Sequence, residues 1–386
     1  MRAIKNAIVI FAFLLIYNFK MGALKDIYSA QFYERLSTVL LEIIPEFNKK
    51  KFISKIFTPE FVQMELKERM RHTTRVMNEF LPENFSEAFL LLKKMMENLR
   101  KNNIGEDSLA YIFIPDYIEI YGINDYENAV KALEFTTQFI TCEFGIRPFL
   151  IKYFDQMMVQ MKDWSKHENQ KVRRLASEGS RSKLPWAMAV PDLKKNPDLV
   201  IEILENLKND SSDFVRRSVA NNLNDIAKDH PEKVLEIAKK WKGISKETDA
   251  IVKHGARTLL KQGHPEILKI YGLDSKNIEV ENLEIVTPKV RIGDSLEFSF
   301  AIKNNNDSVQ TVRLEYGIYF KKAKGHLTKK VFKISEKQYQ PNETIKVNRK
   351  QSFKLITTRV FYAGNHQLSI IINGEEKCIK DFELEF

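Results

Sequence analysis

Two carboxylates stand among arginines and asparagines in predicted helical stretches of the chain. Glu178 lies four residues after Arg174 and three before Arg181, so the three side chains are expected to share a helical face. Asp225 follows Arg217 in a second stretch of the same kind. A carboxylate in a groove that binds phosphates weakens that binding unless it has a separate task. It could stabilise the oxocarbenium character that develops at a sugar when an N-glycosidic bond breaks, or activate the attacking water. Spacing alone favours a salt bridge or a helix cap over catalysis.

An internal repeat is expected to position these residues. The segments VRRLASEG, VRRSVANN and VKHGARTL begin at Val172, Val215 and Val252, which are 43 and 37 residues apart. A period near 40 residues is typical of HEAT-like repeats, in which helix pairs stack into a solenoid with the second helices on the concave side. The aligned residues are then expected to line one groove: Arg174, Arg217 and His254.

The predicted groove is largely cationic. Its third repeat continues with His254, Arg257 and Lys261 at three- and four-residue spacing. Arginine side chains can hold phosphates bidentately, and the net charge of +10 fits a polyanionic partner without showing one. The alternative is that the arginine pairs of the first two repeats form ion pairs with acidic residues of neighbouring repeats: Arg173, Arg174, Arg216 and Arg217. Within the pair Arg173 and Arg174, one residue can be structural and the other functional.

Trp186 is a candidate for stacking on a base or sugar, with burial in the core as the alternative. It follows Leu184-Pro185, and this spacing predicts that a helix begins at Trp186. Trp241 lies at the end of a predicted helix and is interpreted as a core residue.

The chain changes character near residue 278. From about Leu24 to Leu273 apolar residues recur at three- and four-residue spacing, which indicates helices. Strand-like runs with turn signals between them follow: LEIVTPKVRI, SLEFSFAIKN, TVRLEYGIYF, KKVFKIS, RKQSFKL and HQLSIII. We therefore expect a multidomain protein, α then β. An α-solenoid of HEAT-like repeats spans residues 21–273, and an all-β immunoglobulin-like sandwich of about seven strands spans residues 278–386.

Residues 1–20 form an apolar N-terminal extension. The apolar run at residues 7–19 is shorter than the roughly 20 residues of a membrane helix, and no good cleavage site follows it. We interpret Met21 as the functional start, with a weak membrane anchor or export signal as the alternative. The two cysteines, Cys142 and Cys378, lack metal-ligand spacing and are expected to be buried thiols in a reducing compartment.

Five segments together resemble DNA alkylation repair glycosylases of the HEAT-like-repeat superfamily, most closely the AlkC branch, a relative of AlkD. They lie at residues 24–36, 142–150, 172–187, 214–231 and 251–266. The resemblance implies a monofunctional glycosylase of base excision repair that acts on duplex DNA. Its substrates would be cationic N3-alkylated bases, 3-methyladenine and 3-methylcytosine, released without base flipping. It also implies no metal and no organic cofactor. We expect a cytoplasmic, nucleoid-associated monomer. A C-terminal immunoglobulin-like domain occurs in one AlkC subgroup.

The resemblance also implies roles for individual residues. Glu143, which spacing does not single out, joins Glu178 and Asp225 as a carboxylate facing the lesion. Trp186 would form a wall near the deoxyribose. Arg174 and Arg181 would contact phosphates. By repeat alignment the same role extends to three further residues: Arg217, His254 and Arg257.

Two other interpretations remain open at this point. A non-catalytic HEAT-repeat scaffold would bind nucleic acid or a protein and would not need the carboxylates. A membrane-anchored adaptor would depend on residues 7–19 alone. For the C-terminal domain, lysines at 321–324 and 329–330 suggest a grip on DNA, with a protein-interaction module as the alternative.

Overall fold

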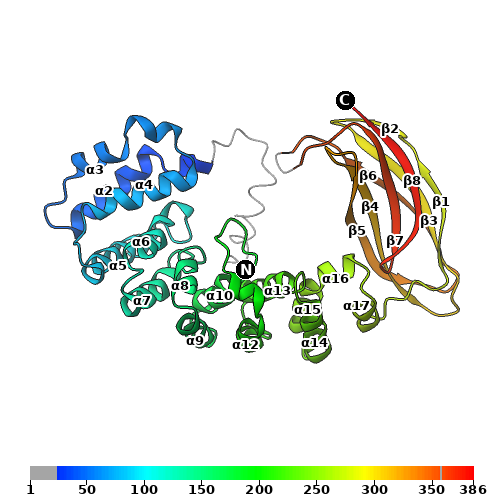
Figure 1. The fold of residues 1–386 in the computed structure, drawn as a ribbon, viewed down its shortest axis with the longest axis horizontal. Coiled ribbons are helices and arrows are strands. Elements are labelled where there is room, and N and C mark those ends of the chain that lie inside the picture. The colour runs from blue at the N-terminus through cyan, green and yellow to red at the C-terminus, as the bar shows by residue number, and fades with distance from the viewer. Residues whose placement is uncertain (1–23, 357–358) are drawn as a thin grey trace. The chain divides into compact units, whose positions relative to one another are not determined.

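The computed structural model describes residues 24–356 and 359–386, in which helices are followed by strands (Figure 1). The chain divides into two compact units. The first runs through residue 230 and includes residues 243–255, and the second comprises residues 231–242 and 256–386. The predicted N-terminal extension at residues 1–20 lies outside the described residues. Within the described ranges no helix combines the length and the apolar character that crossing a bilayer requires.

The helical elements follow one another with short connections. In chain order they are η1 (Leu24–Ile27), α2 (Ala30–Ile43), α3 (Lys49–Ile56), η2 (Pro59–Gln63), α4 (Leu66–Asn78), α5 (Phe85–Lys101), η3 (Leu109–Tyr111), α6 (Phe113–Tyr121), α7 (Tyr126–Thr137), α8 (Arg147–Lys152), α9 (Phe154–Trp164), α10 (Gln170–Gly179), α11 (Pro191–Lys195), α12 (Asp198–Leu207), α13 (Asp213–Ile226), α14 (Pro231–Trp241), α15 (Lys246–Gly255), α16 (Arg257–Lys261) and α17 (Pro265–Ile270).

Polar residues begin many of these helices. Asp125 caps α7 by accepting a hydrogen bond from the backbone N–H of Asn128, which is a frequent role of aspartate at a helix start. Ser212, by contrast, makes no side-chain cap bond at the start of α13. The nearby Asp210 accepts the N–H of Ser212 and also binds an arginine of the preceding repeat.

The second helices of the three repeats pack side by side in the first unit, since α10 contacts α13 and α13 contacts α15. The valines that begin the repeated segments are buried between them: Val172, Val215 and Val252. A Cβ atom on Gly255 would lie 2.7 Å from the Cβ of Leu223, so only glycine allows α15 to approach α13 this closely. The predicted HEAT-like architecture is confirmed.

One predicted helical face is wrong. His254, Arg257 and Lys261 were expected on a single helix, but α15 ends at Gly255 and α16 begins at Arg257. The intervening Ala256 has a ψ angle of 4°, which breaks the α-helical geometry.

The C-terminal strands form two sheets. The strands are β1 (Ile278–Ile285), β2 (Lys289–Arg291), β3 (Ser295–Asn304), β4 (Gln310–Lys321), β5 (Leu327–Tyr339), β6 (Thr344–Ser352), β7 (Gly364–Ile372) and β8 (Glu375–Glu385). One sheet has the order β1-β3-β6 and the other β2-β8-β7-β4-β5. Alternate residues of β3 are buried, and its Phe298 and Phe300 contribute to a core between the sheets. The predicted immunoglobulin-like sandwich is confirmed.

The run LEIVTPKVRI, expected as one strand, is divided between the two sheets. β1 pairs antiparallel with β3, whereas β2 pairs parallel with β8. Pro288 lies between them, and a proline has no N–H for a central sheet ladder and restricts the residue before it. The chain therefore crosses from one sheet to the other at this point.

Candidate active site

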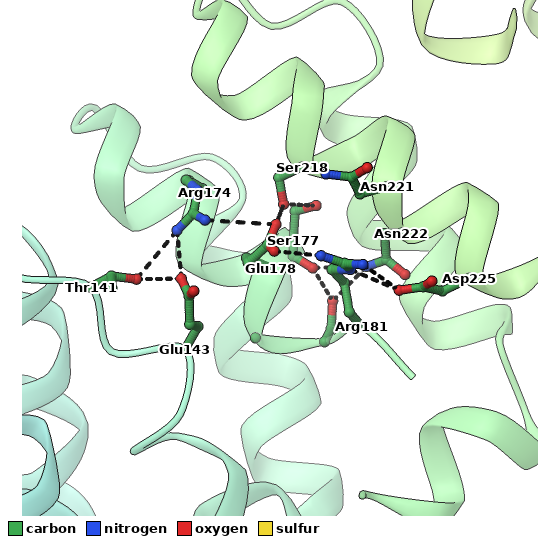
Figure 2. Close-up of polar contacts among 12 residues, drawn as sticks. Thr141, Glu143, Arg174, Ser177, Glu178, Arg181, Ser218, Asn221, Asn222 and Asp225 are labelled. Atoms are coloured by element: carbon green, nitrogen blue, oxygen red, sulfur yellow. Dashed lines mark hydrogen bonds and ion pairs between the residues drawn. The ribbon is translucent and has the colours of Figure 1, made fainter. Parts of the chain in front are cut away.

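Three segments of the first unit bring the predicted carboxylates into one polar network (Figure 2). Glu143 lies in the connection between α7 and α8, Glu178 on α10 and Asp225 on α13. Arg174 and Arg181 lie between them, so the network alternates carboxylate and guanidinium from one end to the other.

At the first end of the network, Arg174 joins two carboxylates. Its Nη1 donates to Oε2 of Glu143 at 2.6 Å, and its Nη2 lies 3.9 Å from Oε2 of Glu178. The hydroxyl of Thr141 also donates to Glu143. The guanidinium of Arg174 lies over the ring of Phe214, 4.5 Å from the ring centre. Arg174 is thus held by ion pairs and by an aromatic ring in the unbound protein.

Glu178 occupies the middle of the network. Its Oε1 accepts from Nη1 of Arg181 at 2.6 Å, and its Oε2 accepts from the hydroxyl of Ser218 at 2.6 Å. Burial raises the pKa of this carboxyl, but the charges of Arg174 and Arg181 and the Ser218 hydroxyl outweigh burial. The net result is a pKa below the usual value, so Glu178 is ionised at neutral pH.

Arg181 joins Glu178 to Asp225, which lies at the other end of the network. Its Nε donates to Oδ2 of Asp225 at 2.8 Å, and Lys228 donates to the second oxygen of Asp225, also at 2.8 Å. Only 1% of Asp225 and 8% of Arg181 are exposed. Arg181 was expected to share a helical face with Glu178, but α10 ends at Gly179 and Arg181 follows it in the loop. In this structure its guanidinium lies between carboxylates, and its expected contact with a phosphate remains a prediction.

Arg173 and Arg174 form ion pairs with acidic residues of neighbouring segments, as the alternative interpretation suggested. Arg216 and Arg217 do not, because both pair with Asp213 of their own helix α13. Nε of Arg173 donates to Oδ2 of Asp210 at 2.6 Å, and its Nη2 donates to Oδ1 at 3.0 Å. Arg216 donates to the carbonyl oxygens of Asp210 and Ser211. Arg173 is therefore structural, whereas its neighbour Arg174 belongs to the network.

The remaining candidates for phosphate contacts are exposed. Arg217 forms an ion pair with Asp213 one turn earlier on α13. Nε2 of His254 lies 3.1 Å from Oδ1 of Asn221. Arg257 begins α16 in the second unit. Their contacts with DNA remain predictions.

Trp186 lies in a turn, and the predicted helix start there is wrong. The backbone N–H of Ala187 donates to the carbonyl of Leu184 at 3.3 Å, with Pro185 and Trp186 between them. Trp186 has a φ of 64°, as the third residue of a type II turn requires, and Pro185 supplies the preferred second residue. The side chain is 74% exposed, so it is not a core residue. Trp241, in contrast, is buried as predicted.

Some residues of the site were missed at the sequence level. Ser218 lies inside the second repeated segment, so its position on the groove side could have been inferred. Thr141 lies outside the repeats, where no spacing identifies it. Glu143 lies there too and was predicted only from the family resemblance. A Cβ atom on Gly145 would lie 2.6 Å from the carbonyl oxygen of Pro115, so glycine lets this connection pack against α6. No group of three His, Cys, Asp or Glu side chains suited to a metal ion occurs in the described part of the chain.

Stacked HEAT-like helix pairs carry this network, an exposed tryptophan lies in the turns after α10, and an immunoglobulin-like sandwich follows. Together these features define a two-part protein of the DNA alkylation repair type. The chain belongs to the DNA alkylation repair enzyme family, whose model matches residues 53–260. A second family model, the C-terminal Ig-like domain of the uncharacterised protein YhaZ, matches residues 279–386.

Two relatives resemble the chain over nearly its whole length. The uncharacterized protein YhaZ of Bacillus subtilis (strain 168) is 43% identical over 365 residues, which cover 94% of this chain and all of that protein. The alkylpurine DNA glycosylase AlkC of Pseudomonas fluorescens, solved bound to DNA containing an abasic site analog, is 32% identical with a TM-score of 0.89. That match covers 95% of this chain and 100% of the solved one. The predicted likeness to the AlkC branch of alkylation repair glycosylases is confirmed.

Proposed function

We propose that the protein is a monofunctional DNA glycosylase that hydrolyses the N-glycosidic bond of cationic N3-alkylated bases in duplex DNA. The bases are 3-methyladenine and 3-methylcytosine, and they are released without base flipping. The observation that carries this proposal is the convergence of Glu143, Glu178 and Asp225, from three separate segments, on one network. The exposed Trp186 follows this network's Arg181 in the same turn-rich segment.

The network suits a reaction in which the leaving base needs no proton. A base alkylated at N3 already carries a positive charge and departs neutral, so the enzyme must stabilise the sugar cation and direct a water molecule. Glu178 has a lowered pKa and can therefore provide a negative charge at neutral pH. The exposed indole of Trp186 provides a flat surface against the deoxyribose.

In this proposal Arg174 links DNA binding to the chemistry. It neutralises Glu143 in the unbound protein. A phosphate that draws the Arg174 guanidinium away would leave the Glu143 carboxylate free to face the developing sugar cation. The mobile partner is then Arg174, while Arg181 stays between Glu178 and Asp225.

The alternative is a HEAT-repeat scaffold that binds nucleic acid or protein without catalysis. One observation favours it: each of the three carboxylates already has an ion-pair partner, as structural carboxylates do. A scaffold of this kind would tolerate neutral substitutes for the carboxylates that retain their hydrogen-bonding shape.

Release of free 3-methyladenine from methylated duplex DNA distinguishes the two functions. Glu178→Gln and Asp225→Asn should lower the single-turnover rate by about 10²- to 10³-fold while DNA affinity is retained. Asp210→Asn is the matched control, because Asp210 is also buried and also paired with an arginine but lies outside the network. No release by the parent, with DNA binding intact, would leave the scaffold as the function. Release at equal rates in all four proteins would contradict the catalytic role proposed for Glu178 and Asp225.

We further propose that the protein acts as a cytoplasmic, nucleoid-associated monomer on double-stranded DNA. A monomer is expected because one lesion occupies one groove. A DNA partner is expected because the family consists of DNA alkylation repair enzymes. Sedimentation of the protein with one lesion-containing duplex should give a complex of one chain per duplex, and a two-chain complex would contradict this proposal.

A further inference from the structure

Arg147, the first residue of α8, is a buried arginine that takes part in no ion pair in the described part of the chain. Only 1% of the residue is exposed. Its Nη1 donates to the carbonyl oxygens of Gly179 at 2.9 Å and Arg181 at 2.7 Å. Its Nε donates to the carbonyl oxygen of Met188 at 3.0 Å. All three acceptors are main-chain atoms of residues 179–188, which we call the tryptophan segment.

Burying a guanidinium without a carboxylate partner destabilises the folded protein, unless nearby dipoles replace the hydration that the charge has lost. Burial, together with the charge of Arg181, lowers the pKa of Arg147 to about 10, so it is still a cation at neutral pH. The three carbonyl dipoles therefore provide its compensation. Because they come from both ends of the tryptophan segment, Arg147 joins these ends to α8.

The tryptophan segment has little regular structure of its own. After α10 ends at Gly179 it forms turns until α11 begins at Pro191. It carries Arg181 near one end and Trp186 near the other, where φ is 64°. A positive φ at a bulky residue costs on the order of 1 kcal/mol or more and persists only where surrounding contacts hold it.

A second cation binds the segment at Trp186. Lys67, an exposed residue of α4, donates from Nζ to the carbonyl oxygen of Trp186 at 2.7 Å. Its ammonium group also lies 5.9 Å from the ring centre of Phe144, the residue next to Glu143. The segment is therefore tied by its carbonyl oxygens at four residues, from two helices that precede it in the chain.

We propose that Arg147, assisted by Lys67, is a positioning residue that fixes the tryptophan segment before DNA binds. It acts through main-chain carbonyls and does not touch the substrate. Its effect on base release rests on the proposed function, whereas its effect on Trp186 does not. When the segment is fixed, the Trp186 indole stays at its strained turn and Arg181 stays between its two carboxylates. The indole surface and the charged groups of the site therefore keep one geometry.

The test compares Arg147→Met, Arg147→Lys and Lys67→Met in the full chain. Time-resolved anisotropy of tryptophan fluorescence reports motion of Trp186, because Trp164 and Trp241 are buried and give no fast component. We expect the fast component to grow in Arg147→Met and to grow less in the other two variants. Single-turnover base release should fall by about 10- to 100-fold in Arg147→Met, with affinity for duplex DNA containing an abasic-site analogue unchanged.

Arg69 provides the matched control. It is 7% exposed and also donates to main-chain carbonyl oxygens, those of Lys25, Val62 and Met64. Arg69→Met should lower the melting temperature without changing Trp186 motion or base release. Equal changes in Arg69→Met and Arg147→Met would overturn the positioning role, and so would unchanged Trp186 motion in Arg147→Met.

The remaining outcomes separate the positioning role from the proposed function. If Arg147→Met does not fold, tryptophan anisotropy and base release are measured in Arg147→Lys and Lys67→Met instead. If the parent releases no base, the proposed function fails and the anisotropy still decides whether Arg147 fixes the segment. If Trp186 loosens while the rate of base release is unchanged, the link from Arg147 to catalysis is refuted.

Discussion

Replacing Arg181 by methionine distinguishes a structural cation from a phosphate contact. The side chains of Glu178 and Asp225 are 8% and 2% exposed, and both would lose their shared guanidinium. Removing one partner of a buried ion pair costs about 3–5 kcal/mol because the other charge stays buried. Glu178 would keep Ser218, and Asp225 would keep Lys228, so we expect a loss near the lower end, about 3 kcal/mol.

The pH dependence of this loss follows from the charge of Glu178. In the parent the pKa of Glu178 is lowered, so its stabilising contribution is present above the usual carboxyl pKa and is lost as pH falls. Without Arg181, Glu178 loses the cation that donates a hydrogen bond to it, and the pKa of Glu178 rises. Acidification then protonates Glu178 and removes the cost of its unpaired buried charge. The stability difference between parent and Arg181→Met should therefore be large at neutral pH and small near pH 4.

Urea unfolding followed by circular dichroism measures this difference at both pH values. Arg217→Met is the comparison variant, because Arg217 is a predicted phosphate contact with an exposed, surface ion pair whose loss costs at most about 1 kcal/mol. The reasoning is refuted if Arg181→Met keeps the parent's stability and instead binds DNA more weakly, with a salt-dependence slope smaller by about one.

Three further substitutions have expected outcomes. Trp186→Gly should relieve the strain at φ 64° and raise stability by up to about 1 kcal/mol, yet abolish most base release; a thermal melt and the release assay check both. Burial lowers the pKa of His366 in the aromatic core of the sandwich, so the native state resists its protonation and stability falls as pH drops below about 6.5. His366→Phe should flatten melting temperature against pH between about 5 and 7.5. Gly263→Ala should destabilise the second unit by about 2–3 kcal/mol, because its Cβ would lie 2.5 Å from the carbonyl oxygen of Gly374 and φ is 69°; a parent-like melt would contradict this.

The architecture follows closely from the sequence because its signals are local and periodic. The repeated valines at 172, 215 and 252 predicted three stacked helices, and they are buried between them. The change near residue 278 to short strand-like runs separated by turn signals predicted the sandwich. The errors lie at ends and breaks, at Ala256, Pro185 and Pro288, where one residue changes the backbone direction and a periodic pattern carries no information.

The site was predicted less completely, because a role depends on the partner of each side chain. Arg173 and Arg174 are adjacent and identical in type, but one pairs with Asp210 and the other with Glu143. A helix turns by about 100° per residue, so the two guanidiniums leave α10 toward different neighbours. Spacing identified both arginines and could not assign their partners.

By itself the sequence determined the two-part architecture, the repeat and the presence of carboxylates among cations. Only the tertiary structure decided how those charges are paired. Arg181 and Asp225 are 44 residues apart in the chain and are joined because α10 and α13 pack together. Arg147 was an ordinary basic residue in the sequence until its guanidinium was found among the carbonyl oxygens of residues 179–188. Ion pairs and hydrogen bonds act over a few ångströms, and which groups come that close is decided by the packing of segments that are distant in sequence.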